Sequence, residues 1–335
     1  MADNRNIVLS AKDIEVKFRV RDNYLTAIRG VSLDLYEGET FAIVGESGSG
    51  KSVSAMSILQ LLDGNGYIDS GEILFEGRDL TKLTEKEMYS VRGNDISVIF
   101  QEPMTSLNPV FTVSRQVSEP FIIHQGMTKK QAAAKVIEML ADVKIPNPHI
   151  VAKQYPHQLS GGMRQRVMIA MALACKPKLL IADEPTTALD VTIQAQILKL
   201  MNDLKEEHGT SIIFITHDLG VIRQIADDVA VMYCGQVVEM APAGTIFMGA
   251  EFSHPYTEGL MNSIPRLSTP THTRLDAIPG AVPHPLKLPK GCKFAPRCKY
   301  ATERCLNEEP EMIHVSETQQ VRCFYPRKED RHGKK

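Results

Sequence analysis

Polar and apolar residues alternate in the first part of the chain, and residues 7–44 are predicted to form strands. Ile14–Phe18 and Val31–Leu35 show the period of two that is typical of half-buried strands. Thr40–Val44 and Ser211–Thr216 are instead almost continuously apolar, which predicts buried strands. Shorter strands are expected at residues 71–77, 96–100, 179–182 and 229–239.

Helical periodicity appears between these strands. Apolar residues from Lys129 to Leu140 recur with a period close to 3.6, so residues 113–145 are predicted to form a helical insert between two halves of a sheet. Helices are also expected over Val53–Leu59 and from Asp190 to about Leu204. Strands that alternate with helices in this way predict an α/β fold.

One glycine-rich stretch joins a predicted strand to a predicted helix: Gly45-Glu46-Ser47-Gly48-Ser49-Gly50-Lys51-Ser52. Its pattern, G-x-x-x-x-G-K-S, is that of a P-loop. The glycines let backbone N–H groups approach phosphate oxygens, Lys51 can reach the β- and γ-phosphates, and the Ser52 hydroxyl suits Mg²⁺. A chance Gly/Ser-rich loop is the alternative, but both flanking elements favour the P-loop.

Two adjacent carboxylates follow the buried strand Leu179–Ala182. Four apolar residues before Asp183 form the Walker B pattern, in which the acid holds Mg²⁺. Glu184 comes next and is the candidate general base, because it can polarise a water against the γ-phosphate. An exposed turn would also explain two acids, but it would leave the P-loop unexplained.

Four weaker signals point to the same chemistry. Gln101 and His217 each follow a predicted strand, where Gln101 can hold Mg²⁺ or the attacking water and His217 can contact the γ-phosphate. Ser160-Gly161-Gly162 opens a helix and forms a second anion site that lacks a lysine. Phe18 can stack on an adenine ring or can belong to the core. Taken singly, a surface glutamine, a structural histidine and a helix cap are the simpler interpretations.

Composition and charge limit the classes of partner and the cellular location that can be expected for this chain. The chain has 335 residues, 43% of them hydrophobic and 23% charged, and a formal charge of −2, so charge gives no reason to expect a nucleic-acid partner. Its longest apolar runs fall short of the ~18 residues of a membrane helix. The first residues lack the apolar core of a signal peptide. A cytosolic protein is expected, with any membrane role supplied by partners.

Taken together, these motifs resemble the ATP-binding subunits of ABC transporters over roughly residues 7–250. The resemblance implies a P-loop NTPase (RecA-like) core with an antiparallel β subdomain and a helical subdomain, the insert lying at about 103–160. It implies an ATPase in which two subunits pair head to tail, with ATP held between one P-loop and the other subunit's Ser160–Gly162. It further implies that Asp190 is the D-loop acid and His217 the switch histidine.

The remainder, residues 251–335, resembles the small, Pro/Cys-rich C-terminal extension of oligopeptide, dipeptide and nickel importer ATPases. This resemblance rests on three segments: His254–Thr257, Ile278–Pro283 and Gly291–Cys298. Ser160–Gly162 correspond to the signature motif of the family, and Met163, which follows them, resembles the residue of the D-type subunit. The implied partners are a second, F-type ATPase, two transmembrane permeases and an extracellular peptide-binding protein. The implied location is the cytoplasmic side of the cell membrane, held through the permeases.

Two alternatives remain for the function. The imported solute is not determined by these residues, so nickel or another solute is open beside di- and oligopeptides. A soluble ABC ATPase acting on DNA or ribosomes is the rival class, although such proteins commonly carry two cassettes. On the importer interpretation, Glu102–Pro109 is expected to contact a permease.

Four cysteines gather near the end of the chain, at Cys292, Cys298, Cys305 and Cys323. A cytosolic location disfavours disulfides, so clustered thiols suggest a metal site. Their C-x5-C-x6-C-x17-C spacing lacks the tight knuckle of structural zinc and suits a 4Fe–4S cluster better, with Zn²⁺ and free thiols as alternatives. The resemblance points the same way, since some peptide-importer ATPases similar to this chain carry such a cluster in this extension. The tail before it, Pro265–Pro289, has six prolines and is expected to be a linker.

Overall fold

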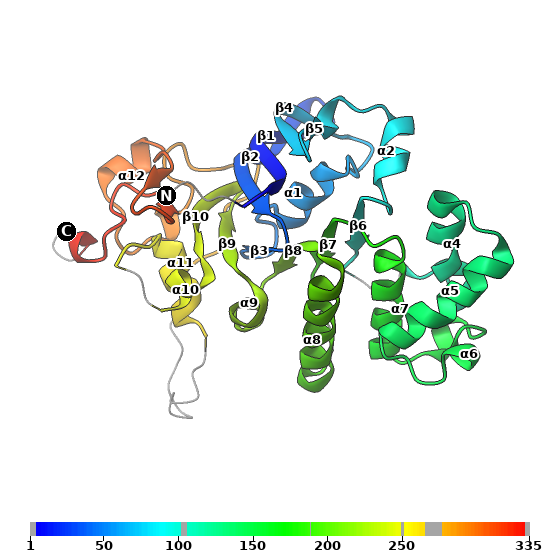
Figure 1. The fold of residues 1–335 in the computed structure, drawn as a ribbon. Helices are drawn as coiled ribbons and strands as arrows, with labels where there is room; N and C mark the ends of the chain where they lie inside the picture. Colours follow the sequence, from blue (N-terminus) through cyan, green and yellow to red (C-terminus); the bar gives the residue numbers. More distant parts are fainter. Residues whose placement is uncertain (1–4, 102–105, 188, 249–250, 265–276, 332–335) are drawn as a thin grey trace. The chain divides into compact units, whose positions relative to one another are not determined.

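A computed structural model describes residues 5–101, 106–187, 189–248, 251–264 and 277–331 (Figure 1). These residues divide into two compact units, and each unit combines separate parts of the chain. The first unit comprises Met1–Leu9, Leu35–Thr40 and Phe75–Ile215. The second comprises Ser10–Asp34, Phe41–Leu74 and Thr216–Lys335. The predicted boundary at residue 250 stays a prediction.

The first unit contains a parallel sheet of β6 (Ile96–Ile99), β7 (Leu179–Asp183) and β8 (Ser211–Thr216). The strands predicted at these positions are confirmed, and β7 is buried along its whole length. Its other elements are β5 (Arg78–Asp79), η1 (Leu80–Lys82), α2 (Glu85–Val91), α4 (Val113–Gln125), α5 (Lys129–Asp142), α6 (Pro148–Val151), η2 (Pro156–Gln158), α7 (Gly161–Leu173) and α8 (Val191–His208).

The predicted helical insert is confirmed as α4 and α5, which pack on each other and on α7 (Figure 1). Thr128 begins α5 with a capping box, since its hydroxyl accepts from the N–H of Gln131 and the Gln131 side chain accepts from the N–H of Thr128. The buried face of α5 has the predicted period and includes Ala132, Val136 and Leu140.

The second unit holds most of an antiparallel region in which β1 (Ile7–Val20) lies between β2 (Asn23–Tyr36) and β4 (Gly66–Phe75). It also holds β3 (Thr40–Val44), which pairs in parallel with β9 (Asp228–Tyr233). The remaining elements are α1 (Lys51–Ile58), α9 (Leu219–Ile225), β10 (Gln236–Pro242), α10 (Ala243–Phe247), α11 (Pro255–Asn262), η3 (Ala295–Arg297), α12 (Glu303–Asn307), β11 (Ile313–His314), β12 (Gln320–Val321) and η4 (Glu329–Arg331).

The C-terminal extension continues this sheet. β9 and β10 form a hairpin that turns at Cys234 and Gly235, as the alternation around Gly235 predicts. β12 then pairs with β10 in antiparallel fashion, and β11 pairs with β12. The extension is therefore bonded to the cassette by backbone hydrogen bonds as well as by side chains.

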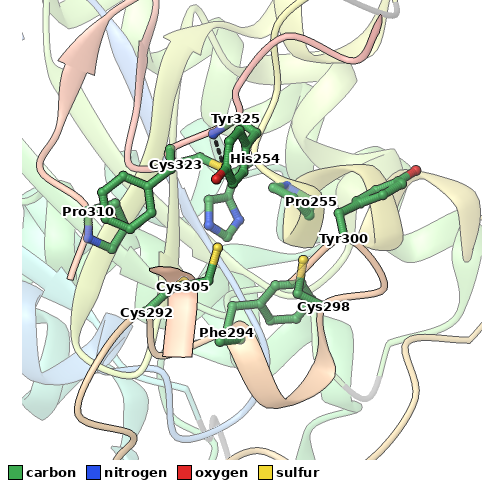
Figure 2. Close-up of a pocket in the computed structure, with 12 residues that line it drawn as sticks. His254, Pro255, Cys292, Phe294, Cys298, Tyr300, Cys305, Pro310, Cys323 and Tyr325 are labelled. Atoms are coloured by element: carbon green, nitrogen blue, oxygen red, sulfur yellow. Dashed lines mark hydrogen bonds between the residues drawn. The ribbon is translucent and has the colours of Figure 1, made fainter. Parts of the chain in front are cut away.

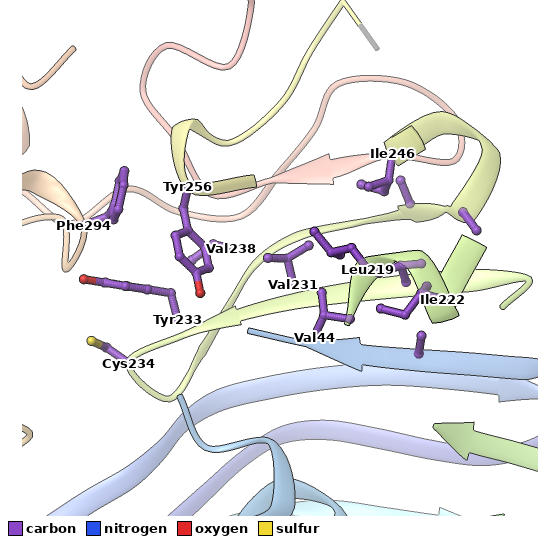
Figure 3. Close-up of a cluster of buried hydrophobic side chains, with 14 residues drawn as sticks. Val44, Leu219, Ile222, Val231, Tyr233, Cys234, Val238, Ile246, Tyr256 and Phe294 are labelled. Atoms are coloured by element: carbon purple, nitrogen blue, oxygen red, sulfur yellow. The ribbon is translucent and has the colours of Figure 1, made fainter. Parts of the chain in front are cut away.

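An aromatic cluster joins the extension to β9 (Figure 3). The ring centroids of Tyr233 and Tyr256 lie 4.7 Å apart, and the Phe294 ring meets Tyr233 edge-on at 5.3 Å. Burial of such rings is worth about 2–3 kcal/mol each, and the paired geometry adds roughly 0.5–1.5 kcal/mol. The C-terminal extension thus shares a hydrophobic core with β9 and β10, because its own aromatic side chains pack on those of the hairpin.

The expectation of a linker between Pro265 and Pro289 is wrong for its last part. Residues 265–276 lie outside the described residues, but Ile278, Val282 and Leu288 pack against the buried hydrophobic cluster that contains these aromatic rings. Prolines prevent a helix or strand here without preventing burial of the apolar side chains between them. Among the described residues, no helix combines the length and apolar character needed to cross a bilayer.

Candidate functional site

The P-loop lies between β3 and α1, as predicted. Gly45 has φ +155°, and a Cβ there would stand 2.2 Å from the Met232 carbonyl oxygen, so only glycine fits. Gly50 caps α1 in the left-handed region, with φ +100°. Lys51 opens the helix, and its buried ammonium donates to the carbonyl oxygens of Gly45 (2.9 Å) and Glu46 (3.1 Å). These contacts hold the Lys51 side chain within the P-loop, where the phosphates of ATP are expected to bind.

A cavity of about 580 Å³ adjoins the P-loop in the second unit. Ser47, Gly48 and Gly50 line it together with Phe18, which is half-buried at the end of β1. The structure thus brings the predicted adenine-stacking ring and the predicted phosphate loop to one pocket. The assignment of Phe18 as the stacking residue stays a prediction.

Glu184 is positioned at the carboxyl end of β7. Its Oε2 accepts hydrogen bonds from Nε2 of Gln101 at 3.1 Å and from Oγ1 of Thr187 at 2.9 Å. Its backbone has φ +46°, a left-handed conformation that is strained for a side chain with a Cβ, and its N–H donates to the Ile215 carbonyl. Strain of this kind persists where surrounding bonds enforce it and is typical of functional sites.

The sheet register explains why these residues meet. β6 and β7 run in parallel with Ile99 opposite Ala182, so Gln101 and Asp183 both leave the sheet at its carboxyl edge. Asp183 is only 5% exposed. A buried carboxylate at this edge, beside an amide and a second carboxylate, supplies the oxygen ligands that Mg²⁺ prefers.

The signature residues and the D-loop acid both cap helices of the first unit. Ser160 is the N-cap of α7 and accepts from the N–H of Met163 at 3.3 Å. Asp190 is the N-cap of α8 and accepts from the N–H of Ile193 at 2.9 Å. Ser160, Gly161 and Asp190 are exposed, and Gly162 is half-buried, so close to Ile193 that a Cβ would stand 3.0 Å from its Cγ2. Both helix N-termini are therefore accessible from solvent.

The predicted residues fall into two groups. The first unit brings together Gln101, Asp183 and Glu184, and it also carries the signature and Asp190. The second unit carries Phe18 and the P-loop, including Ser52, and the exposed His217 that follows β8. In the predicted permease-contacting segment, Glu102–Pro109, residues 102–105 lie outside the described residues.

Sequence reasoning missed an ion pair that joins the P-loop to the C-terminal extension. Arg297 of η3 donates from Nη1 to Oε2 of Glu46 at 2.6 Å and from Nη2 to Oε1 at 3.0 Å, a bidentate pair. The hydroxyl of Tyr256 accepts from the N–H of Glu46 at 2.8 Å. Hydrogen bonding to the Glu46 carboxylate raises the pKa of the 4%-exposed Arg297 above its usual range. No sequence pattern signals a pair across 251 residues.

The four C-terminal cysteines all line one pocket, together with His254, Phe294 and Tyr325 among others (Figure 2). Among the described residues none of the four takes part in a disulfide, and burial raises the pKa of the Cys292 thiol. Among the described residues, no group of three or more His, Cys, Asp or Glu side chains is arranged to hold a metal ion. The four cysteines thus share one pocket, and their role as metal ligands stays a prediction.

Comparisons with known proteins agree on the family. The ABC transporter family matches residues 28–187, and the oligopeptide/dipeptide transporter C-terminal region matches residues 238–305. The chain is 51% identical to the oligopeptide transport ATP-binding protein AppD of Bacillus subtilis, over 95% of this chain and 96% of that protein. It is 49% identical to the oligopeptide transport ATP-binding protein OppD of Salmonella typhimurium, over 96% and 94%.

Among solved structures, a dimeric ATP-binding cassette in a post-hydrolysis state with ADP and Pi is similar, with a TM-score of 0.63 and 30% identity. The match covers 70% of this chain and 98% of that cassette. The predicted α/β P-loop NTPase fold is confirmed by this likeness. The motifs, the fold and the matched C-terminal region together assign the chain to the ATP-hydrolysing ABC transporter family, as a member of its oligopeptide/dipeptide transporter ATP-binding proteins.

Proposed function

We propose that this chain hydrolyses ATP with Glu184 as the general base. The observation that carries the proposal is the pair of hydrogen bonds from Gln101 and Thr187 to one oxygen of the Glu184 carboxylate. These bonds orient the carboxylate at the end of β7 so that it can take a proton from water as the water attacks the γ-phosphate. Lys51 and the P-loop N–H groups bind the phosphates during this step.

Mg²⁺ is the proposed metal of the ATP site, because the predicted ligands carry the oxygen donors that this ion prefers. Ser52, Asp183 and Gln101 are its proposed ligands, which supply a hydroxyl, a carboxylate and an amide oxygen. When bound, the ion neutralises charge on the β- and γ-phosphates. Gln101 already donates from Nε2 to Glu184, which leaves its carbonyl oxygen as the atom for the metal.

The signature is proposed to act on the ATP of a second subunit. Ser160 to Gly162 form an exposed anion site without a lysine, which suits a γ-phosphate already held by another P-loop. Asp190 and His217 complete the head-to-tail interface and the γ-phosphate contact. A second ATPase of the F type is the proposed partner, so that each ATP is held between two different chains.

ATP hydrolysis by this chain is proposed to power the uptake of di- and oligopeptides across the cytoplasmic membrane. The related proteins are oligopeptide and dipeptide transport ATP-binding proteins, and the matched C-terminal region carries that description. The proposed complex contains two permeases in the membrane, with a peptide-binding protein on the outer side. This chain lies on the cytoplasmic face and is held by the permeases.

A 4Fe–4S cluster is the proposed occupant of the cysteine pocket. Four thiols from separate segments converge on it, and Phe294, Phe324 and Tyr325 add apolar walls. Each thiolate of such a cluster binds a different iron, so the sulfurs stand farther apart than around one zinc ion. A cluster therefore does not require a single-ion arrangement of three or more side chains, and the described residues contain none. The cluster's role here is to crosslink the extension.

The test uses the transporter purified with both permeases and the second ATPase. Glu184→Gln retains ATP binding and traps occluded nucleotide, while hydrolysis falls by two orders of magnitude or more, because only the base is lost. Lys51→Ala instead weakens ATP binding itself. Glu207→Gln, an exposed acid of α8, is the matched control. Wild-type hydrolysis by Glu184→Gln refutes the base, and failure to copurify with permeases refutes the transport role.

A further inference from the structure

The cavity beside the P-loop has walls from two distant parts of the chain. One wall contains Phe18 and the P-loop residues, as expected for a nucleotide site. The other comes from the C-terminal extension and contains Val282, Pro283, His284, Pro285 and Leu288. Nothing in the P-loop, Walker B or signature motifs requires this second wall.

The second wall is fixed at both ends. Val282 and Leu288 pack against the buried hydrophobic cluster that includes Tyr233, Tyr256 and Phe294. Between them, the imidazole Nδ1 of His284 accepts from the N–H of Leu286 at 3.2 Å, which leaves Nε2 as the protonated nitrogen of the neutral ring. Prolines on both sides restrict the backbone further. The segment is therefore a preformed surface.

Arg297 connects the two walls. Its Nε donates to the carbonyl oxygen of Pro279 at 3.0 Å, three residues before the wall begins. Its two terminal nitrogens hold the Glu46 carboxylate within the P-loop, and Nη1 also lies 3.4 Å from the Tyr233 hydroxyl. One buried guanidinium therefore donates to the P-loop, to the aromatic cluster and to the backbone just before the second wall.

We propose that the C-terminal extension completes the ATP site in cis. The lining residues Val282, Pro283, His284, Pro285 and Leu288 form a wall that contacts the base and ribose of ATP. Arg297 is a positioning residue that fixes the position of this wall relative to the P-loop. The cavity has room for a nucleoside, whose apolar faces suit proline and aliphatic side chains and whose polar edge suits the His284 imidazole. Arg297 touches no phosphate in this arrangement and acts through Glu46.

The first test separates the base from the phosphates. The purified full-length chain is titrated calorimetrically with ATP and, separately, with inorganic tripolyphosphate. The double variant His284→Ala/Pro285→Ala changes two exposed wall residues without disturbing the core, and we expect about 5–10-fold weaker ATP binding with unchanged tripolyphosphate binding. Leu286→Ala is the matched control, because Leu286 is 53% exposed in the same segment and does not line the cavity.

Two outcomes overturn the wall. Wild-type ATP affinity in the double variant shows that the second wall does not contact the nucleotide. Equal weakening of ATP and tripolyphosphate shows that the effect passes through the P-loop rather than through the base. Either result leaves the ATPase assignment intact, since that rests on the P-loop and on Glu184.

The second test concerns Arg297. Arg297→Met leaves the Glu46 carboxylate without its partner, so the chain can lose stability for that reason alone. The double variant Arg297→Met/Glu46→Met removes both charges and restores the fold, which circular dichroism and thermal melting verify. We expect this folded variant to bind both ATP and tripolyphosphate about tenfold more weakly, with a raised KM for ATP and a nearly unchanged kcat in the assembled transporter.

Lys299→Met breaks an exposed ion pair with Glu258, two residues from Arg297, and is expected to leave both affinities unchanged. If the folded Arg297→Met/Glu46→Met variant binds both probes as the wild type does, Arg297 has no positioning role. A fall in kcat without a change in KM also contradicts the proposal.

Discussion

The amide Nε2 of Gln101 lies 3.1 Å from the carboxylate Oε2 of Glu184, although 83 residues separate them. Parallel pairing of β6 with β7 causes this proximity, because it brings the carboxyl ends of both strands to one edge. Thr187 donates to the same oxygen at 2.9 Å. The proposed base is therefore oriented by two neutral donors, one from another strand and one from its own turn.

Thr187→Val is expected to lower the kcat for ATP by roughly tenfold, because a hydrogen bond to a charged group contributes about 1.5–3 kcal/mol and its loss frees the Glu184 carboxylate to rotate. ATP affinity should stay unchanged, since Thr187 is not in the P-loop. Steady-state hydrolysis and equilibrium ATP titration measure the two effects. Thr187→Ser keeps the hydroxyl and should restore most of the rate. Equal rates for the valine and serine variants contradict the orienting role.

Gly45→Ala is expected to destabilise the chain by about 3 kcal/mol or more, because the new Cβ would stand 2.2 Å from the Met232 carbonyl oxygen. Gly38→Ala is the matched control. Gly38 also has a positive φ (+71°), but a Cβ there meets no atom within 4 Å, so backbone strain alone costs about 1 kcal/mol. Urea unfolding followed by circular dichroism measures both. Similar losses in the two variants would mean that the contact with Met232 relaxes.

Stability should fall at acid pH through Glu309. Burial raises the pKa of this carboxyl, but hydrogen bonds from Lys293 (2.7 Å) and Gln236 (2.5 Å) outweigh burial and hold the pKa below its ordinary value of 4.5. The folded chain therefore binds the proton less readily than the unfolded chain. This contribution is fully present above pH 4.5 and is lost as pH falls through the folded pKa.

Urea midpoints at pH 7, 5 and 4 test the role of Glu309. Glu309→Gln should be less stable than the wild type at pH 7, and its stability should depend less on pH between 5 and 4. Glu308→Gln is the neighbouring control, since Glu308 makes only an exposed pair with Arg304. If all three proteins lose stability in parallel, Glu309 does not supply the acid sensitivity.

The cysteine pocket should yield iron when the protein is purified without air. We expect about four irons and four sulfides per chain and a brown absorbance near ~400 nm, because four thiolates are the ligand set of a 4Fe–4S cluster. Cys298→Ser should bleach it, whereas Cys175→Ser, outside the pocket, should not. Stoichiometric zinc without iron would replace the cluster by zinc. Absence of both metals would refute the assignment of the four cysteines as metal ligands.

The local sequence determined the phosphate-binding machinery. Glycines between Gly45 and Gly50, followed by Lys51 and Ser52, predict a P-loop because backbone conformation there depends on residue type at each position. The strands and the helical insert were also predictable, since hydrophobic periodicity reports directly which face is buried. Asp183 and Glu184 could be placed at a strand end for the same reason, and so could Gln101.

Tertiary structure alone decided how the C-terminal extension is used. Its prolines predict a linker, yet Val282 and Leu288 pack on a buried hydrophobic cluster, and burial depends on which surface the segment meets. The Arg297–Glu46 pair joins residues 251 positions apart, and no periodicity or motif records such a distance. Contacts of this kind form because folding brings complementary charges together in a buried site, and that meeting is a property of the whole chain.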